Sequence, residues 1–343
     1  LQHIPYSEQL KWKGRFVLEA LSRIGGIEVD EVPVTGSPDT SQYRNRMTFT
    51  LRRLRGGRVV AGFHGLDRPG HVIDVRGECV LPEPEIASAW MALRDNWGSS
   101  ARRLPSGGRL RLTLRNSRSG VDLLIEGGRS TWNPESLMTR VSPVSTVWHE
   151  PSDSGVIELV YGRPHEEIWI EKELLLVGDV FLQVNRDAAH LLQEHVIAIA
   201  GSPDSAIDAY CGVGCYGRHL ANSGTTVVGI DVNGAALTSS SENEDVNYRT
   251  VKGAVEEHLA NFLPVELLIL NPPRSGLERT IPLQILNTPP ETIIYVSCDP
   301  ATLARDLDRL LPSYSLAGYQ AFDLFPQTAH IETVAVLKRS KNQ

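Results

Sequence analysis

The chain has 343 residues, of which 41% are hydrophobic and 22% charged, with a formal net charge of −7. This length predicts two domains, and no apolar run reaches the length of a membrane span, so we expect no membrane association. The four cysteines, Cys79, Cys211, Cys215 and Cys298, are too few for a disulfide scaffold, which favours a reducing, cytoplasmic setting. The first residue is Leu and no signal-peptide pattern follows it, so we expect a fragment or trimmed product of a longer, monomeric protein.

The charge is distributed unevenly along the chain. Residues 1–125 hold 19 Lys and Arg against 13 Asp and Glu, whereas residues 126–343 hold 15 against 28. Of the 19 basic residues in the first part, 17 are Arg, the residue best suited to bidentate phosphate recognition. This modest excess fits nucleic-acid contact, and it equally fits an ordinary solvated surface.

The first half predicts helices and an antiparallel sheet. Residues 7–24 place their apolar side chains on one side of a helix, which Gly25-Gly26 ends, and residues 82–97 predict a second helix. Residues 43–51 end in clear alternation, and residues 109–115 alternate strictly, with leucines on one face and mainly arginines on the other. Residues 121–125 return as the hairpin partner. The basic face either binds a phosphate backbone or is the wet side of the sheet.

From about residue 174 the pattern becomes alternating strands and helices, which predicts a mostly parallel, doubly wound, Rossmann-like sheet. The expected strands are 206–210, 226–230, 247–251, 267–270, 292–296 and 333–337. The expected helices are 185–200, 215–223, 234–243, 254–262, 279–287 and 300–311. We therefore expect an α/β chain with a boundary near residues 171–180. It separates an N-terminal α+β domain, 1–173, containing the antiparallel sheet, from a Rossmann-like domain, 174–343.

A glycine-rich loop follows the first strand of the second domain. Gly212, Gly214 and Gly217 satisfy G-x-G-x-x-G, which lets a backbone turn tightly and approach a ligand, and Asp231 ends the next strand, where it can accept hydrogen bonds from ribose hydroxyls. The alternative is an ordinary tight turn, but strand, loop, helix and acid in register favour an adenosine ligand. Cys211, Cys215 and His219 lack a second ligand pair, so we predict no metal site.

Two buried strands of this domain end at polar signatures. Residues 267–270 lead into Asn271-Pro272-Pro273-Arg274, and residues 293–296 lead into Ser297-Cys298-Asp299-Pro300. Ligands of open α/β sheets bind beyond the carboxyl ends of the strands, so Asn271 and Cys298 are expected side by side at a site. Asp299 and Pro300 begin a helix, whose dipole favours a thiolate at Cys298. For a lone cysteine the alternative is a small buried apolar residue.

These segments resemble the RNA uracil-C5 methyltransferase family, which uses S-adenosylmethionine. Segment 181–185 resembles the family's F-x-Q-V-N, 208–214 its D-x-F-C-G-x-G, and 271–274 its D-P-P-R. Segment 297–307 is close to the nucleophile signature, and 325–333 (F-P-Q-T-A-H-I-E-T) is close to the C-terminal signature. The resemblance also reaches residues 43–46 and the region around Asp74 and Cys79.

The resemblance implies a role for each matched residue. Cys298 would be the thiolate that adds to uracil C6, and Glu332 the base that removes the C5 proton. Four matched positions bind or adjoin the cofactor, and two shape the pocket for a flipped uracil. The first set is Gln183, Tyr210, Asp231 and Asn271, beside Gly212 and Gly214 of the loop, and the second is Phe181 and Arg274.

The resemblance further implies an RNA partner. The N-terminal half resembles the ribosomal members, so 23S rRNA is the expected substrate and the tRNA T-loop is the alternative. Cys215, Ala254 and Asn271 depart from the family pattern near the cofactor, which admits a decayed RNA-binding protein, although Cys298 and Glu332 oppose that reading. A nicotinamide-dependent oxidoreductase would explain the glycine loop and Asp231 but neither polar signature.

Cys79 lies in a segment that resembles the one carrying the fourth ligand of an iron–sulfur cluster in some family members. The other three ligands would precede Leu1, and a cluster needs several thiolates, so we expect none in this chain. A longer parent protein with three upstream cysteines could bind one. Otherwise Cys79 is a core residue.

Overall fold

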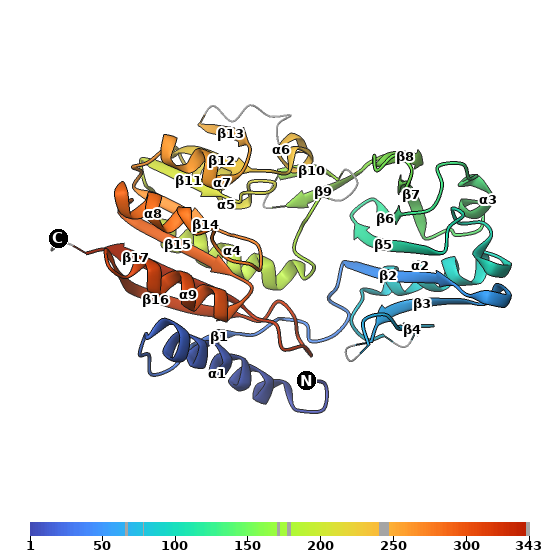
Figure 1. Cartoon of the computed structure of the whole chain (residues 1–343), viewed down its shortest axis with the longest axis horizontal. Coiled ribbons are helices and arrows are strands. Elements are labelled where there is room, and N and C mark those ends of the chain that lie inside the picture. Colours follow the sequence, from blue (N-terminus) through green and yellow to red (C-terminus); the bar gives the residue numbers. More distant parts are fainter. Residues whose placement is uncertain (66–67, 78, 170–171, 177–179, 240–246, 341–343) are drawn as a thin grey trace. The chain divides into compact units, whose positions relative to one another are not determined.

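The computed structural model describes residues 1–65, 68–77, 79–169, 172–176, 180–239 and 247–340. It divides into two compact units, drawn in Figure 1: unit 1 comprises Leu1–Thr40 and Asn185–Gln343, and unit 2 comprises Ser41–Val184. None of the helices within the described ranges is both long enough and apolar enough to cross a membrane.

Unit 2 is built on a seven-stranded sheet in the order β4-β3-β2-β5-β6-β7-β8, with a separate β9-β10 hairpin. Its elements are β2 Arg46–Arg53, η1 Arg55–Gly57, β3 Val59–His64, β4 Val72–Asp74, α2 Pro84–Asn96, η2 Ser99–Ala101, β5 Arg109–Ser117, β6 Gly120–Glu126, α3 Glu135–Met138, β7 Val144–Glu150, β8 Glu158–Tyr161, β9 His165–Trp169 and β10 Lys172–Leu176. The predicted hairpin is β5-β6, and α2 buries Trp90 and Leu93 in the core beneath it.

Unit 1 contains an eight-stranded sheet in the order β1-β16-β17-β15-β14-β11-β12-β13. Its elements are α1 Tyr6–Gly25, β1 Val34–Thr35, α4 Arg186–Ala200, β11 Ser205–Ala209, α5 Cys215–Asn222, β12 Thr226–Asp231, α6 Gly234–Ser239, β13 Tyr248–Lys252, α7 Val255–His258, η3 Leu259–Asn261, β14 Leu267–Leu270, α8 Thr280–Asn287, β15 Thr292–Ser297, α9 Pro300–Leu310, β16 Tyr314–Phe322 and β17 Glu332–Arg339. The strands from β15 to β13 are parallel and β17 runs antiparallel beside β15, so the predicted fold class is confirmed.

The division into units differs from the boundary that we expected at residues 173 and 174. Residues 1–40, predicted to belong to the N-terminal domain, lie in unit 1 (Figure 1). The physical reason is packing: Val17 and Leu21 of α1 are buried in the same core as Leu303 and Leu307 of α9. These contacts join residues almost 300 positions apart, so no local pattern reveals them.

Strand β16 was not predicted from the sequence, because its half-buried residues and the register shift between Leu316 and Gly318 blur its alternation. Parts of the expected boundary (177–179) and of the expected helix 234–243 (240–243) lie outside the described residues.

Candidate active site

The carboxyl ends of the neighbouring strands β11, β14 and β15 meet at one edge of the sheet in unit 1. The register pairs Ala209 with Leu270 and Leu270 with Tyr295, and the Asn271 backbone N–H donates to the Ala209 carbonyl at 3.2 Å. The segments that begin at Tyr210, at Asn271 and at Cys298 therefore leave the sheet at the same edge. This arrangement agrees with the location expected for a ligand in an open α/β sheet.

The glycines of the loop after β11 serve different purposes. Gly212 has a φ of 56°, and a Cβ there would meet no atom within 4 Å, so the backbone at this point borders open space. At Gly214, in contrast, a Cβ would lie 2.6 Å from the Tyr248 hydroxyl, and at Gly217 it would lie 2.9 Å from Asp208 Oδ2. Gly214 and Gly217 are thus required by packing, whereas Gly212 leaves room for a ligand.

Two aspartates hold this loop. Asp231 Oδ2 accepts from the Gly212 N–H and Asp231 Oδ1 from the Asn233 N–H, both at 2.7 Å, and each oxygen retains a lone pair for a hydroxyl. Asp208 is fully buried, accepts from the Gly217 N–H at 2.9 Å and has its pKa raised to about 7 by burial. The sequence analysis gave Asp208 no role, because its function depends on the depth at which β11 lies.

Cys298 is half-buried and directly precedes Asp299, the N-cap of α9. Asp299 accepts from the N–H groups of Ala301 and Thr302, at 2.9 and 3.0 Å. Burial raises the pKa of the Cys298 thiol, and the charge of Glu332 raises it further. This direction is opposite to the effect that we expected from the helix dipole, because burial of the thiol is the largest influence on its pKa.

Glu332 begins β17 and lies across from the cysteine. The antiparallel register pairs Ser297 with Thr333, so one further step places Cys298 opposite Glu332. Glu332 is only 3% exposed, and burial raises the pKa of its carboxyl to about 8. The arrangement brings together the two residues that the sequence analysis paired as nucleophile and base.

Arg274 connects these two groups electrostatically. Its guanidinium lowers the pKa of Glu332 and, by charge and by a hydrogen bond, that of Cys298, in both cases against the larger effect of burial. An exposed arginine beside a thiol and a buried carboxyl favours the ionised form of both. Arg274 is therefore placed to promote the thiolate as well as the carboxylate.

The loop that carries Arg274 is held by α9. The buried Asp306 accepts from the Leu277 N–H at 2.8 Å and from the Tyr295 hydroxyl at 2.9 Å, while Arg305 donates to the Ser275 carbonyl at 2.8 Å. Gly276 has a φ of 76°, and a Cβ there would lie 2.4 Å from Asp306 Oδ2. The nucleophile signature thus contains both the cysteine and the anchor of the neighbouring loop, a function that the sequence analysis missed.

Comparison with known proteins identifies the chain. A family model described as tRNA (Uracil-5-)-methyltransferase matches residues 254–340. An uncharacterized RNA methyltransferase of Thermosynechococcus vestitus is 32% identical over 371 residues, covering 99% of this chain and 81% of the relative. This chain belongs to the RNA uracil-C5 methyltransferase family. A relative from Halalkalibacterium halodurans, also an uncharacterized RNA methyltransferase, is 30% identical and covers 98% of this chain and 80% of its own length.

A solved structure agrees with the assignment. The tRNA (uracil-54, C5)-methyltransferase of Pyrococcus abyssi, in complex with S-adenosyl-L-homocysteine, matches with a TM-score of 0.74 and 26% identity, over 98% of this chain and 84% of that chain. The family resemblance, the enzyme class and S-adenosylmethionine as cofactor, all predicted from the motifs, are confirmed. The protein is an S-adenosylmethionine-dependent RNA (uracil-5-)-methyltransferase.

The remaining predicted site residues of the methyltransferase lie in different places. Tyr210 directly follows β11, has a φ of 61° and is half-buried, which raises the pKa of its hydroxyl. Phe181 and Gln183 belong to unit 2, where Phe181 is 60% exposed and the Gln183 carbonyl accepts from Asn45 at 3.0 Å. The cofactor and uracil contacts predicted for these three residues stay predictions.

The basic face of the methyltransferase's antiparallel sheet is shorter than we expected. Arg109 and Arg111 of β5 are exposed, and Arg52 on β2 pairs directly with Arg109. Arg115, which the alternation placed on the same wet face, is buried and donates to the Val180 carbonyl at 2.8 Å. The expectation fails there because β5 is a central strand whose second half is covered on both faces.

The cysteines outside the site have distinct surroundings. Cys211 is buried in the glycine loop, which raises the pKa of its thiol, and Cys79 packs against the core of unit 2. Among the described residues, no group of three or more His, Cys, Asp or Glu side chains could hold a metal ion. An iron–sulfur role for Cys79 in a longer parent protein stays a prediction.

Proposed function

We propose that this methyltransferase modifies C5 of one uridine in 23S rRNA through a covalent adduct between Cys298 and uracil C6. The observation that supports the proposal most strongly is the register that places Cys298 across from the buried Glu332, with Arg274 acting on both. A nucleophile directly after β15 and a base at the start of the neighbouring β17 can act successively on adjacent atoms of one ring.

Cys298 and Glu332 account for the covalent and proton-transfer steps at the uracil ring. The Cys298 thiolate forms a bond to C6, and the C5–C6 π electrons move toward the C4 carbonyl, which makes C5 nucleophilic. S-adenosylmethionine, when bound, would supply an electrophilic methyl group for attack by C5, and its sulfur would retain the electron pair of the broken sulfur–carbon bond. The Glu332 carboxylate then removes the C5 proton, the C5–H pair restores the C5–C6 double bond, and the C6–sulfur bond breaks to return the thiolate.

The residues at the glycine loop fit the cofactor. The open space at Gly212 and the free lone pairs of Asp231 suit the sugar hydroxyls of an adenosine, and Asn271 leaves the sheet beside Tyr210. Gly214 supports the loop by its packing on Tyr248. Gln183, by its match to the family motif, is a further candidate for a polar contact with the cofactor.

The RNA substrate has one strong alternative. The similar Pyrococcus abyssi enzyme acts on uridine 54 of tRNA, which favours the tRNA T-loop as a second candidate. In either RNA, Phe181 and Arg274 would shape the pocket for a flipped uracil. Mapping 5-methyluridine in 23S rRNA and tRNA from cells with and without the gene separates the two substrates.

Two variants test the chemistry. Cys298→Ala should abolish methyl transfer and leave S-adenosylmethionine affinity within a few-fold of its original value, because the proposed role of the cysteine is to bond to the uracil ring and not to hold the cofactor. Glu332→Gln should still add to C6 and methylate C5, but proton removal stalls, so a denaturant-resistant protein–RNA band accumulates. Substantial turnover by Cys298→Ala rules out covalent catalysis here, and normal turnover without an adduct in Glu332→Gln excludes Glu332 as the base. If the unsubstituted protein transfers no methyl group to RNA, that result would favour the alternative of a decayed RNA-binding protein, which Cys215 and Ala254 suggest.

A further inference from the structure

The segment between β16 and β17 is a long connection that ends at Glu332, the proposed general base. Its two flanking residues, Phe322 and Glu332, are register partners, so residues 323–331 leave the sheet and return to it at the same level. We call these nine residues the base loop. A loop of this length without secondary structure needs external contacts to keep one conformation.

An ion pair buried in unit 1 anchors the start of the base loop. Lys13 on α1 is fully buried, and its Nζ lies 2.5 Å from Asp323 Oδ1 and donates to the Phe325 carbonyl at 3.0 Å. Asp323 Oδ1 also accepts from the Phe325 N–H at 3.0 Å. A buried ion pair adds little net stability, because desolvation offsets the attraction, but it specifies the geometry of the groups that it joins.

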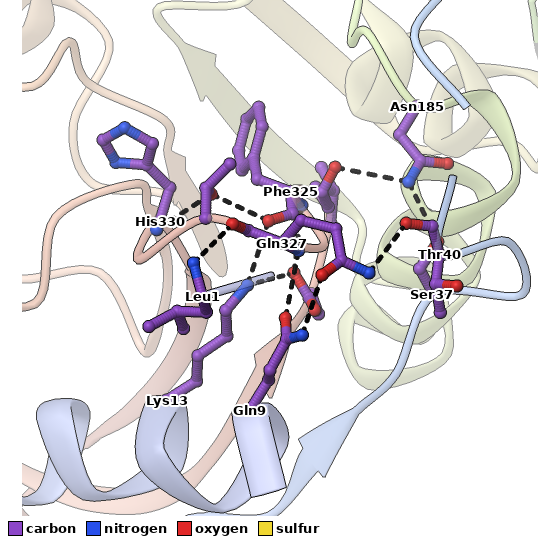
Figure 2. Close-up of polar contacts among 12 residues, drawn as sticks. Leu1, Gln9, Lys13, Ser37, Thr40, Asn185, Phe325, Gln327 and His330 are labelled. Atoms are coloured by element: carbon purple, nitrogen blue, oxygen red, sulfur yellow. Dashed lines mark hydrogen bonds and ion pairs between the residues drawn. The ribbon is translucent and has the colours of Figure 1, made fainter. Parts of the chain in front are cut away.

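A second contact from the same helix anchors the middle of the loop. Gln327 N–H donates to Gln9 Oε1 at 3.0 Å, Gln9 Nε2 donates to Gln327 Oε1 at 2.9 Å, and Gln327 Nε2 donates to the Thr40 carbonyl at 3.2 Å. Figure 2 shows these bonds converging on Gln327 from α1 and from the segment that follows β1. Gln327 has a φ of 69°, a conformation that side chains disfavour, so these bonds hold a backbone that would otherwise relax.

The rest of the loop is closed by its own turn. The Phe325 carbonyl accepts from the Thr328 hydroxyl at 2.8 Å, and Thr328 Oγ1 accepts from the His330 N–H at 3.2 Å (Figure 2). Hydrogen bonds therefore link Lys13 and Gln9 to the loop as far as His330, and two residues of backbone lead from there to Glu332. We propose that Lys13 and Gln9 of α1 are positioning residues, which set the base loop and through it the placement of the Glu332 carboxylate.

This inference rests on the proposed role of Glu332 as the base, and it assigns α1 a specific place in the reaction. Attack by Cys298 and methyl transfer do not use Glu332, whereas proton removal does. Displacing the carboxylate should therefore slow only the last step, and a misplacement of about 1 Å is enough to cost one or two orders of magnitude in rate. A purely structural role would instead reduce every step equally.

The experiment uses Lys13→Met, which keeps the length of the side chain without its charge, and Gln9→Ala. Each is mixed with S-adenosylmethionine and 23S rRNA transcribed in vitro, with a tRNA transcript as second probe, in a single turnover. We expect methyl incorporation at a rate near that of the unsubstituted protein. We expect release of the adduct to be slower on the order of tenfold or more, so that the denaturant-resistant band persists. Lys11→Met is the matched control, because Lys11 is exposed and pairs only with the exposed Glu8 among the described residues.

Three outcomes are decisive. A uniform loss of rate without persistence of the adduct, in variants whose unfolding temperature shows them to be folded, overturns the inference. If Lys13→Met fails to fold, Gln9→Ala decides the question, since it leaves no buried charge without its partner. Glu332→Gln is measured first. If this variant forms no adduct, the proposed function is refuted. If it forms an adduct but the α1 variants do not, only the present inference is overturned.

Discussion

At the scale of single residues, the environment decides what each group can do. The half-buried thiol of Cys298 directly follows β15, and the buried carboxyl of Glu332 begins the neighbouring β17. Burial disfavours ionisation of both groups, and the charge of Glu332 further disfavours the Cys298 thiolate. Arg274 counters this effect for both. The protonation states of Cys298 and Glu332 therefore depend on one arginine that belongs to a third segment of the chain.

The rate of adduct release should depend on pH. With a pKa of about 8, Glu332 carries a proton at neutral pH in the free protein, so release should accelerate as pH rises and level off above about 8. Arg274→Met should shift this profile to higher pH, because it removes the charge that lowers the pKa. The measurement is single-turnover decay of the adduct across roughly pH 6 to 10. If the rate of adduct release in the unsubstituted protein did not change with pH, this would contradict the assignment of Glu332 as the general base.

The same group links stability to pH. Burial raises the Glu332 pKa from its ordinary value of 4.5 to about 8, so between these values the folded state binds a proton that the unfolded state has released. The free energy of unfolding should therefore fall as pH rises through this window, by on the order of 5 kcal/mol, and level off above it. Glu332→Gln lacks the titrating proton and should show a shallower fall. Urea unfolding of both proteins near pH 5 and pH 9 checks the difference, and parallel curves would count against it.

At the scale of secondary-structure elements, α9 supports two parts of the site at once. Asp299 caps its first turn directly after Cys298, and Asp306 in its second half holds the loop that carries Arg274. The helix buries Leu303, Leu307 and Leu310 against the sheet, so both supports are rigid. A change in α9 should therefore affect the nucleophile and the arginine together.

Asp306→Ala tests this support. The substitution leaves the buried Leu277 N–H and Tyr295 hydroxyl without their acceptor, which should lower the free energy of unfolding by about 3 kcal/mol or more. Tyr295→Phe removes one donor and should cost only about 1 kcal/mol. The control is Asp308→Ala, an exposed position on the same helix, where we expect a change within about 0.5 kcal/mol. Equal effects at positions 306 and 308, measured by chemical denaturation, would refute the anchoring role.

At the scale of the whole molecule, the two units differ in charge. Unit 2 holds 19 Lys and Arg against 17 Asp and Glu, whereas unit 1 holds 15 against 24. The basic excess of residues 1–125 is thus diluted by acidic residues later in unit 2. What remains is local: Arg52 and Arg109 lie directly opposite each other on β2 and β5, with Arg111 two residues along. Arg111 also forms an ion pair with Glu126 at 2.7 Å, which offsets part of its charge. Like charges paired across strands, as at Arg52 and Arg109, are destabilising, and an anionic partner would relieve that repulsion.

These three arginines should contribute to RNA affinity. Changing Arg52, Arg109 and Arg111 together to Glu should weaken binding and reduce the salt dependence by up to about 2 to 3 in log–log slope, because fewer counterions are released. Cofactor affinity should not change. Arg140→Glu, an exposed site after α3, is the control, and filter binding of the rRNA transcript at several salt concentrations is the measurement. Unchanged affinity at low salt would identify the face as solvated surface.

The parts that sequence patterns predicted are those encoded locally. The apolar run 267–270, the cap and proline at 299 and 300, and the glycine loop each depend on neighbours in the chain, so the fold class and the carboxyl-edge location of Asn271 and Cys298 followed from them. The long signatures at 297–307 and 325–333 added the family. Gly214 and Asp231 were recognisable by spacing alone, although their contacts were not.

The remainder depends on contacts between distant segments, which only tertiary structure supplies. Three features show this: the packing of α1 on α9, the Lys13–Asp323 ion pair and the burial of Arg115. In each case the neighbouring residues in the sequence do not indicate the contact. The pKa values of Cys298 and Glu332 belong to the same category. A helix dipole can be inferred from a cap motif, but desolvation depends on what covers a side chain, and here that effect is the larger one.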